Sequence, residues 1–119
     1  MKRTILLFAL FICILSCEER DALVPENQIP PWLNAEINGY ELALRQNPKN
    51  PVFNGIAWIR YKWKDEYYFE YRNMISSTYA YPISFNRDTL KVCPVCVGTD
   101  YYENKCCKQY VWKGSSYFE

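Results

Sequence analysis

Apolar and polar residues follow two different periods along this chain, and they divide it into a helical and a sheet part. Between residues 31 and 46 the apolar positions recur every three or four residues, at Leu33, Ile37, Tyr40 and Leu44. This spacing places them on one stripe of a helix. Pro31 suits the first turn of a helix, and Asn47-Pro48 ends it. We therefore expect an amphipathic helix over residues 31–46.

Beyond residue 55 the pattern changes to the alternation of β-strands. Residues 56–63 and 67–72 are rich in branched and aromatic side chains, and the polar break Lys64-Asp65-Glu66 between them has the length of a hairpin turn. Further strands are expected over 79–85, 89–93 and 106–112. We expect the helix to cover the apolar face of this sheet, with Ala57, Ile59, Tyr61 and Trp63 on one side of the first strand. The charged face is expected to open to water.

Together these patterns predict an α+β fold. It consists of one N-terminal amphipathic helix packed on an antiparallel β-sheet of three to five strands, with a disulfide-stapled C-terminal part. Residues 31–119 are enough for a single small globular domain. A domain of this size buries only about 60 to 65% of the surface of its unfolded chain, so cross-links would add useful stability.

The N-terminus carries an export pattern. Met1-Lys2-Arg3 is basic, residues 4–15 are apolar apart from Thr4, and Ser16-Cys17 follows. This order is typical of a signal peptide, and the apolar run is too short to span a bilayer by itself. Ile14-Leu15-Ser16-Cys17 resembles the lipobox of bacterial lipoproteins. The resemblance implies that residues 1–16 are removed and that Cys17 carries diacylglycerol and fatty acids such as palmitate. A retained membrane anchor and an ordinary secretory peptide with an incidental Cys17 are the alternatives.

Residues 17–30 have no apolar period and are interpreted as the lipidated cysteine followed by a flexible acidic tether. The cluster of Glu18, Glu19 and Asp21 resembles the sorting signal of small Bacteroidota lipoproteins that reside on the outer face of the outer membrane. The resemblance implies a lipid-anchored protein of the cell envelope, facing the periplasm or the cell surface. A solvated tether without a sorting role is the alternative.

The charge and composition of the chain argue against two classes of function, nucleic-acid binding and catalysis. The chain has 14 basic and 13 acidic residues, and losing Lys2 and Arg3 leaves 12 basic residues, scattered along the chain. Nucleic-acid binding needs a clustered basic surface, so no nucleic-acid partner is expected. Histidine, the commonest general base, is absent from the sequence. Asp65-Glu66 and Asp88 could supply a pair of carboxylates, but we interpret them as solvated turn residues, as is usual for adjacent acids in a hairpin loop. We expect no catalytic residues, no cofactor and no enzyme activity.

After loss of Cys13 and lipidation of Cys17, four cysteines remain. They are Cys93, Cys96, Cys106 and Cys107. In an exported domain they favour disulfides, and neighbouring strand residues point to opposite faces. We favour the nested pairing Cys93–Cys107 and Cys96–Cys106, with one β-bulge, over the crossed pairing and over a Cys106–Cys107 ring, which we expect to be strained. A structural zinc site of four thiolates and a thiol-redox role for Cys93-Pro94-Val95-Cys96 are the alternatives; no metal ligand is assigned.

Aromatic residues are the remaining functional feature. Most are interpreted as core and cross-strand pairs. Trp58, Tyr68 and Tyr81 alternate away from the assigned apolar faces and are the candidates for display to a ligand. The leading hypothesis is a non-enzymatic binding or structural module, tethered to the membrane through Cys17, with a protein or glycan partner. A surface glycan-binding accessory protein is the second hypothesis, and a thiol-redox or zinc protein built on the four cysteines is the third.

Overall fold

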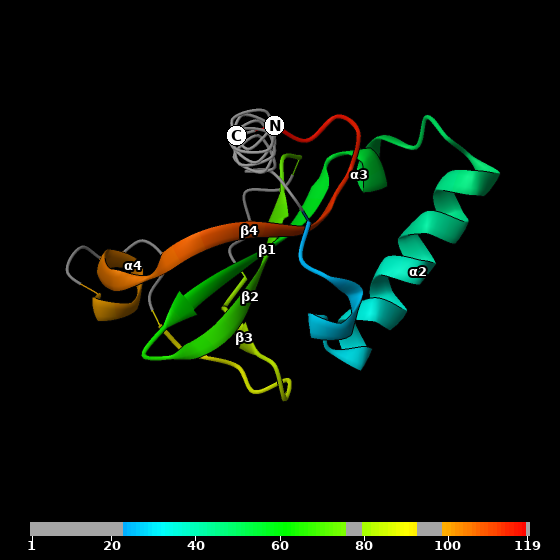
Figure 1. The fold of residues 1–119 in the computed structure, drawn as a ribbon. Coiled ribbons are helices and arrows are strands. Elements are labelled where there is room, and N and C mark those ends of the chain that lie inside the picture. The colour runs from blue at the N-terminus through cyan, green and yellow to red at the C-terminus, as the bar shows by residue number, and fades with distance from the viewer. Residues whose placement is uncertain (1–22, 76–79, 93–98, 119) are drawn as a thin grey trace, which may run out of the picture.

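The structure, a computed structural model, describes residues 23–75, 80–92 and 99–118. Cys17 and the expected signal peptide, as well as Cys93 and Cys96, lie outside the described residues. The fold is α+β (Figure 1). In chain order its elements are η1 (Glu26–Gln28), α2 (Pro31–Gln46), α3 (Pro51–Asn54), β1 (Ile56–Trp63), β2 (Glu66–Asn73), β3 (Ile83–Ser84), α4 (Asp100–Asn104) and β4 (Cys106–Lys113). The short helices α3 and α4 were not expected from the sequence.

The four strands form one antiparallel sheet in the order β3-β2-β1-β4. This confirms the expected antiparallel sheet. Lys64 and Asp65 connect β1 to β2, and both have positive φ, as a two-residue type I′ hairpin turn requires. Glu66 already pairs with Trp63 and belongs to β2, so the turn is one residue shorter than the polar break.

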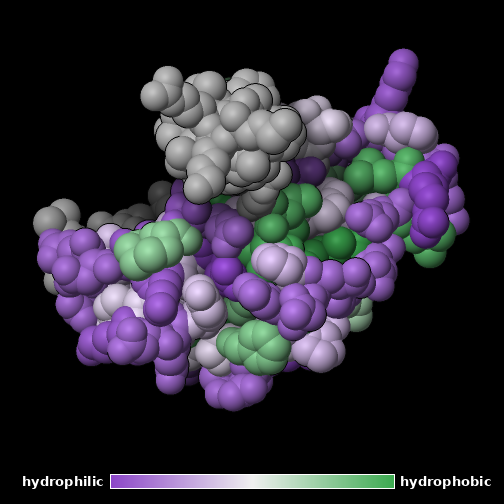
Figure 2. Space-filling view, in the orientation of Figure 1, coloured by the Kyte–Doolittle hydropathy of each residue, from purple (hydrophilic) through white to green (hydrophobic). Residues whose placement is uncertain are grey.

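Helix α2 spans the residues that the apolar spacing indicated, beginning at Pro31 and ending before Asn47. Leu33 and Ile37 are buried on its sheet-facing side. They share a hydrophobic core with Val24, Trp58, Phe69 and Val111. Figure 2 shows hydrophobic residues grouped where α2 meets the sheet, with hydrophilic residues around them. Burial of this stripe, rather than helix propensity alone, stabilises α2.

The face of the sheet that α2 covers differs from the expectation. Trp58 pairs with Tyr71 and Arg60 pairs with Phe69, so these residues share the face under α2. Ala57, Ile59, Tyr61 and Trp63 lie on the opposite face. That face is also covered, because Tyr101 of α4 packs against Trp63 and Tyr68. The expectation of one water-exposed charged face was wrong: strand alternation separates two faces, but it cannot say what covers each.

Strand β4 pairs with β1 through two register shifts. Val111 is the extra residue of the first, and Cys107 and Lys108 lie opposite Tyr61 at the second. Cys107 has a φ of 66°, which takes it out of extended geometry. The structure joins Cys106 to Cys107 in a disulfide. The nested pairing is incompatible with this bond. It had required a hairpin between residues 93–96 and 106–107, whereas β4 pairs with β1 and places Cys106 opposite Lys62.

The expected strands over 79–85 and 89–93 are largely absent from the described residues. Only Ile83–Ser84 forms a strand, and Thr89 makes an isolated bridge to Ile83. Pro82 has no N–H to donate and directly precedes β3, which limits the pairing on that side. Within the described ranges, no helix combines the length and apolar character needed to cross a membrane.

Candidate functional site

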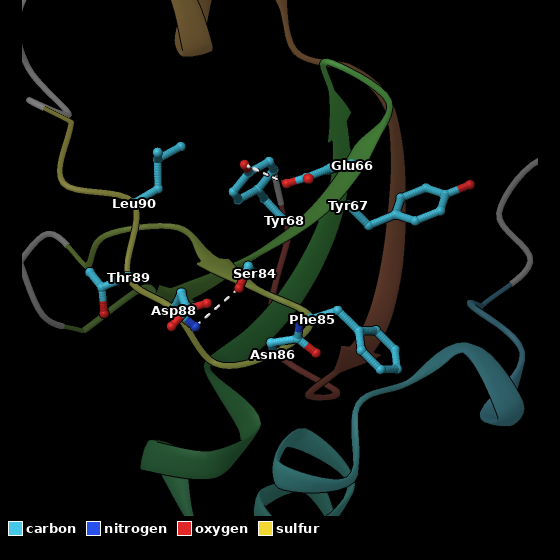
Figure 3. Close-up of a pocket in the computed structure, with 9 residues that line it drawn as sticks. All are labelled: Glu66, Tyr67, Tyr68, Ser84, Phe85, Asn86, Asp88, Thr89 and Leu90. Atoms are coloured by element: carbon cyan, nitrogen blue, oxygen red, sulfur yellow. Dashed lines mark hydrogen bonds between the residues drawn. The ribbon is translucent and has the colours of Figure 1, made fainter.

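A pocket of about 490 Å³ lies at the sheet edge, between the beginning of β2 and the segment that follows β3 (Figure 3). This volume lies in the range of small-molecule sites. The nine residues that line the pocket are Glu66, Tyr67, Tyr68, Ser84, Phe85, Asn86, Asp88, Thr89 and Leu90. The lining therefore combines two carboxylates, an amide and two aliphatic hydroxyls with three aromatic rings.

Pairing between β2 and β3 positions one side of the pocket. Glu66 and Tyr68 are two residues apart, so both point to the same face of β2, and Figure 3 shows Tyr67 pointing the other way. Tyr68 pairs with Ser84. The Tyr68 hydroxyl donates to Glu66 Oε2 at 3.1 Å. Burial, together with this hydrogen bond, raises the pKa of Tyr68. Its hydroxyl thus stays protonated and orients the Glu66 carboxylate.

A tight turn after β3 positions the other polar groups. The Ser84 N–H donates to the Asp88 carbonyl at 2.8 Å, and the Asp88 N–H donates to Ser84 Oγ at 3.0 Å. Arg87, with a φ of 71°, makes the sharp bend that these bonds close. The turn holds Asn86 and Asp88 at the pocket with their side chains exposed to solvent. Polar groups held by a closed turn are well suited to orient a ligand.

Two aromatic rings at the rim are exposed but anchored. The guanidinium of Arg60 stacks on the Tyr67 ring, with its central carbon 4.0 Å from the ring centroid. Arg60 is buried and donates to the side-chain oxygens of Gln28 at 2.9 Å and Gln109 at 2.7 Å. At Phe85, the indole N–H of Trp32 donates to the backbone carbonyl at 2.9 Å. Arg60 therefore restrains the Tyr67 ring, and the bond from Trp32 fixes the backbone that carries Phe85, which lowers the entropic cost of using these rings in binding.

A second polar cluster lies between β2 and α4. Glu70 is only 4% exposed. Its carboxylate accepts hydrogen bonds from Arg72 at 2.7 Å, from the Tyr101 hydroxyl at 2.7 Å and from Lys105 Nζ at 2.8 Å. Lys105 also lies 3.8 Å from the centroid of the Tyr61 ring. A buried carboxylate with three donors is well satisfied, so we assign this cluster a structural role.

The three aromatic residues predicted to contact a ligand differ in exposure and in whether they line the pocket. Trp58 is 4% exposed and donates from its indole N–H to the Tyr40 hydroxyl, so its expected display was wrong. Tyr68 is also buried, yet its side chain lines the pocket. Tyr81 is 46% exposed but is not part of the pocket lining. Alternation assigned Trp58 and Tyr68 to open faces, and α2 and α4 cover those faces.

The structure also brings together residues that sequence reasoning had set aside. Glu66 and Asp88 line one pocket, whereas Asp65 lies in the hairpin turn outside it. Phe85 and Asn86 had no distinguishing signal in the sequence. Their position depends on β2–β3 pairing across a long loop, which local patterns do not report.

Two of the four candidate thiols are joined to each other. The Cys106–Cys107 disulfide removes two of the thiolates that a four-cysteine zinc site would need. Within the described ranges, no three His, Cys, Asp or Glu side chains are grouped closely enough to hold a metal ion. The zinc and thiol-redox hypotheses also depend on Cys93 and Cys96, which lie outside those ranges.

Comparison of the chain with models of protein families, with curated proteins and with solved structures found no match.

Proposed function

We propose that this protein is a lipid-anchored, non-enzymatic binding module of the bacterial cell envelope, and that it binds its ligand in the pocket between β2 and residues 84–90. The anchor is the lipidated Cys17 indicated by the basic and apolar N-terminus and the lipobox-like Ile14-Leu15-Ser16-Cys17. The acidic residues after Cys17 favour the outer membrane as its location.

The composition of the pocket lining is the main support for a binding function. Its acceptors, Glu66 and Asp88, line the pocket together with hydroxyl and amide groups. The Tyr68 hydroxyl bonds to the Glu66 carboxylate, and a turn closed by the Asp88 N–H and Ser84 Oγ positions Asp88. Convergent polar groups in a concavity of this volume are typical of ligand sites. Both carboxylates are exposed to solvent, and the lining contains neither thiol nor imidazole, so binding fits these groups better than acid–base or nucleophilic catalysis.

A glycan is the ligand class that the rim favours. Tyr67 and Phe85 are exposed aromatic rings that belong to the same pocket lining as the carboxylates. A sugar offers an apolar C–H face that packs on such rings, and hydroxyls that donate to carboxylate oxygens. The pocket is therefore proposed to bind a glycan at the cell surface. A small polar ligand of another class is the alternative.

The test measures binding of the full, detergent-solubilised chain to an oligosaccharide array, followed by calorimetry with the strongest hit. Glu66→Gln and Asp88→Asn should each weaken binding by about 10-fold or more, because each removes a hydrogen bond to a charged group. Asp65→Asn is the matched control, since Asp65 lies next to Glu66 but outside the lining, and it should bind like the unaltered chain. Equal binding by all three variants would contradict the assignment of the pocket.

A further inference from the structure

Three segments meet at one end of the sheet. In this antiparallel order β1 begins where β2 and β4 end, so α3, residues 74–75 and residues 114–118 gather at the same end. The Met74 N–H donates to the Gly55 carbonyl at 3.0 Å, and the Ser116 N–H donates to the Asn54 carbonyl at 2.9 Å. These bonds hold the segments together as one surface.

Large apolar side chains project from this surface. They are between 44% and 73% exposed, and they are Val52, Met74, Ile75 and Phe118, which we call the apolar tip. Exposed Lys49 and Lys113 flank it. The opposite end of the sheet carries the charged hairpin turn, where Lys64 pairs with Asp100 of α4 at 3.6 Å. The two ends of the molecule therefore differ in polarity.

The chain enters the domain on the side of the apolar tip. The Val24 N–H donates to the Tyr110 carbonyl of β4 at 2.8 Å, and further along the chain Gln28 meets Arg60. In Figure 1 the first described residues, in blue, begin beside the end of β4 where the red C-terminal segment starts. Leu23 is exposed there. Leu23 is six positions after Cys17 in the sequence, and a chain of six residues spans at most about 20 Å.

We propose that the apolar tip docks on the bilayer that holds the lipid of Cys17. This inference rests on the proposed lipid anchor. The anchor keeps the tip at a high effective concentration near the membrane, so a patch of four side chains too small to bind alone is sufficient. Lys49 and Lys113 complement anionic headgroups.

Docking by the apolar tip has a consequence for the pocket. Glu66 and Tyr68 lie at the beginning of β2, whereas the tip lies beyond its end at Asn73. A strand of this length spans roughly 25 Å. The tip therefore faces the bilayer while the pocket points away from it, open to ligands outside the membrane.

The test places the photo-crosslinking amino acid p-benzoylphenylalanine at Phe118 of the full chain, expressed in a Gram-negative host. The matched control carries it at Phe85, which is also an exposed phenylalanine but lies at the pocket rim. After irradiation of the membranes, mass spectrometry should find phospholipid adducts several-fold more often at residue 118 than at residue 85. The same amino acid placed at Ile75 should give the same result as at Phe118. This second site keeps the test valid if the substitution at residue 118 displaces residues 114–118.

The outcomes separate the two proposals. A lipidated Cys17 without preferential phospholipid adducts at residues 118 and 75 overturns the docking surface and leaves the anchor intact. Adducts with a second copy of the chain or with another protein at these sites overturn it as well, in favour of a protein interface. An unmodified Cys17 in the intact mass overturns the anchor, and with it the inference.

Discussion

Tyr101 donates a hydrogen bond of 2.7 Å to Glu70, a residue 31 positions earlier in the chain, and thereby ties α4 to the centre of β2. The bond joins a fully buried phenol to a buried carboxylate, which Arg72 and Lys105 also neutralise. Burial, and then the bond to Glu70, raises the pKa of Tyr101. In this way a polar cluster closes the sheet face opposite α2, on which Ile59 and its partner Glu70 lie.

Replacing Glu70 by glutamine should destabilise the domain by about 2 kcal/mol or more. The substitution leaves the charges of Arg72 and Lys105 without their buried counter-ion. Urea unfolding of the purified chain measures the loss. Glu103→Gln on the exposed side of α4 is the control and should change stability by less than about 0.5 kcal/mol. Equal midpoints for the two variants would show that the cluster contributes nothing.

Stability should fall in alkaline solution through Tyr40. Burial raises the pKa of Tyr40 to about 12, and its hydrogen bond to Glu36 acts in the same direction. Because the folded state holds this proton more tightly than the unfolded chain, the contribution is fully present below about pH 10 and is lost as the pH rises through about 12. Urea titrations between pH 8 and pH 11.5 measure the fall.

Tyr40→Phe separates the effect of the phenol proton from packing. At pH 8 the variant should lose about 1 kcal/mol, because the Trp58 indole N–H loses its acceptor. Above pH 10 its stability should decline less steeply than that of the unaltered chain. An unchanged alkaline slope would mean that other groups carry the pH dependence.

Gly39→Ala should stabilise the protein by about 1 kcal/mol. Gly39 lies inside α2, and a Cβ at this position meets nothing within 4 Å, so the substitution gains helix propensity without strain. Gly114 is the opposite case, because a Cβ there would collide with the carbonyl oxygens of Phe53 and Asn54. Thermal unfolding should therefore give a higher Tm for Gly39→Ala and a lower one for Gly114→Ala.

Trp58→Ala should cost about 3 to 5 kcal/mol, since the side chain fills the core between α2 and the sheet. Trp58→Phe retains most of the apolar contact and serves as a milder variant if the alanine variant does not fold. Tyr81→Ala, at an exposed position, should change stability by less than about 0.5 kcal/mol. Chemical denaturation of the three variants provides the comparison, and a small loss for both Trp58 variants would restore the idea that this ring is displayed.

Local patterning alone accounts for the position of most long elements. The apolar spacing of residues 31–46, the alternation of residues 56–63 and the polar break at Lys64 coincide with α2, β1 and the hairpin turn, because each depends on contacts within a few residues. The candidate site was visible only as separate signals. Glu66 and Asp88 were noted as acids but interpreted as solvated turn residues.

Tertiary structure decided the rest, because the relevant contacts join residues far apart in the chain. Pairing of β2 with β3 brings Glu66 and Asp88 to one pocket, and α4 buries Glu70 through a partner 31 positions away. Strand β4 pairs with β1 and places Cys106 opposite Lys62, whereas the nested disulfides had required a hairpin between residues 93–96 and 106–107. Hydrophobic periodicity reports which residues share a face. It carries no information on which distant segment covers that face, since the packing energy is gained only when the whole chain is folded.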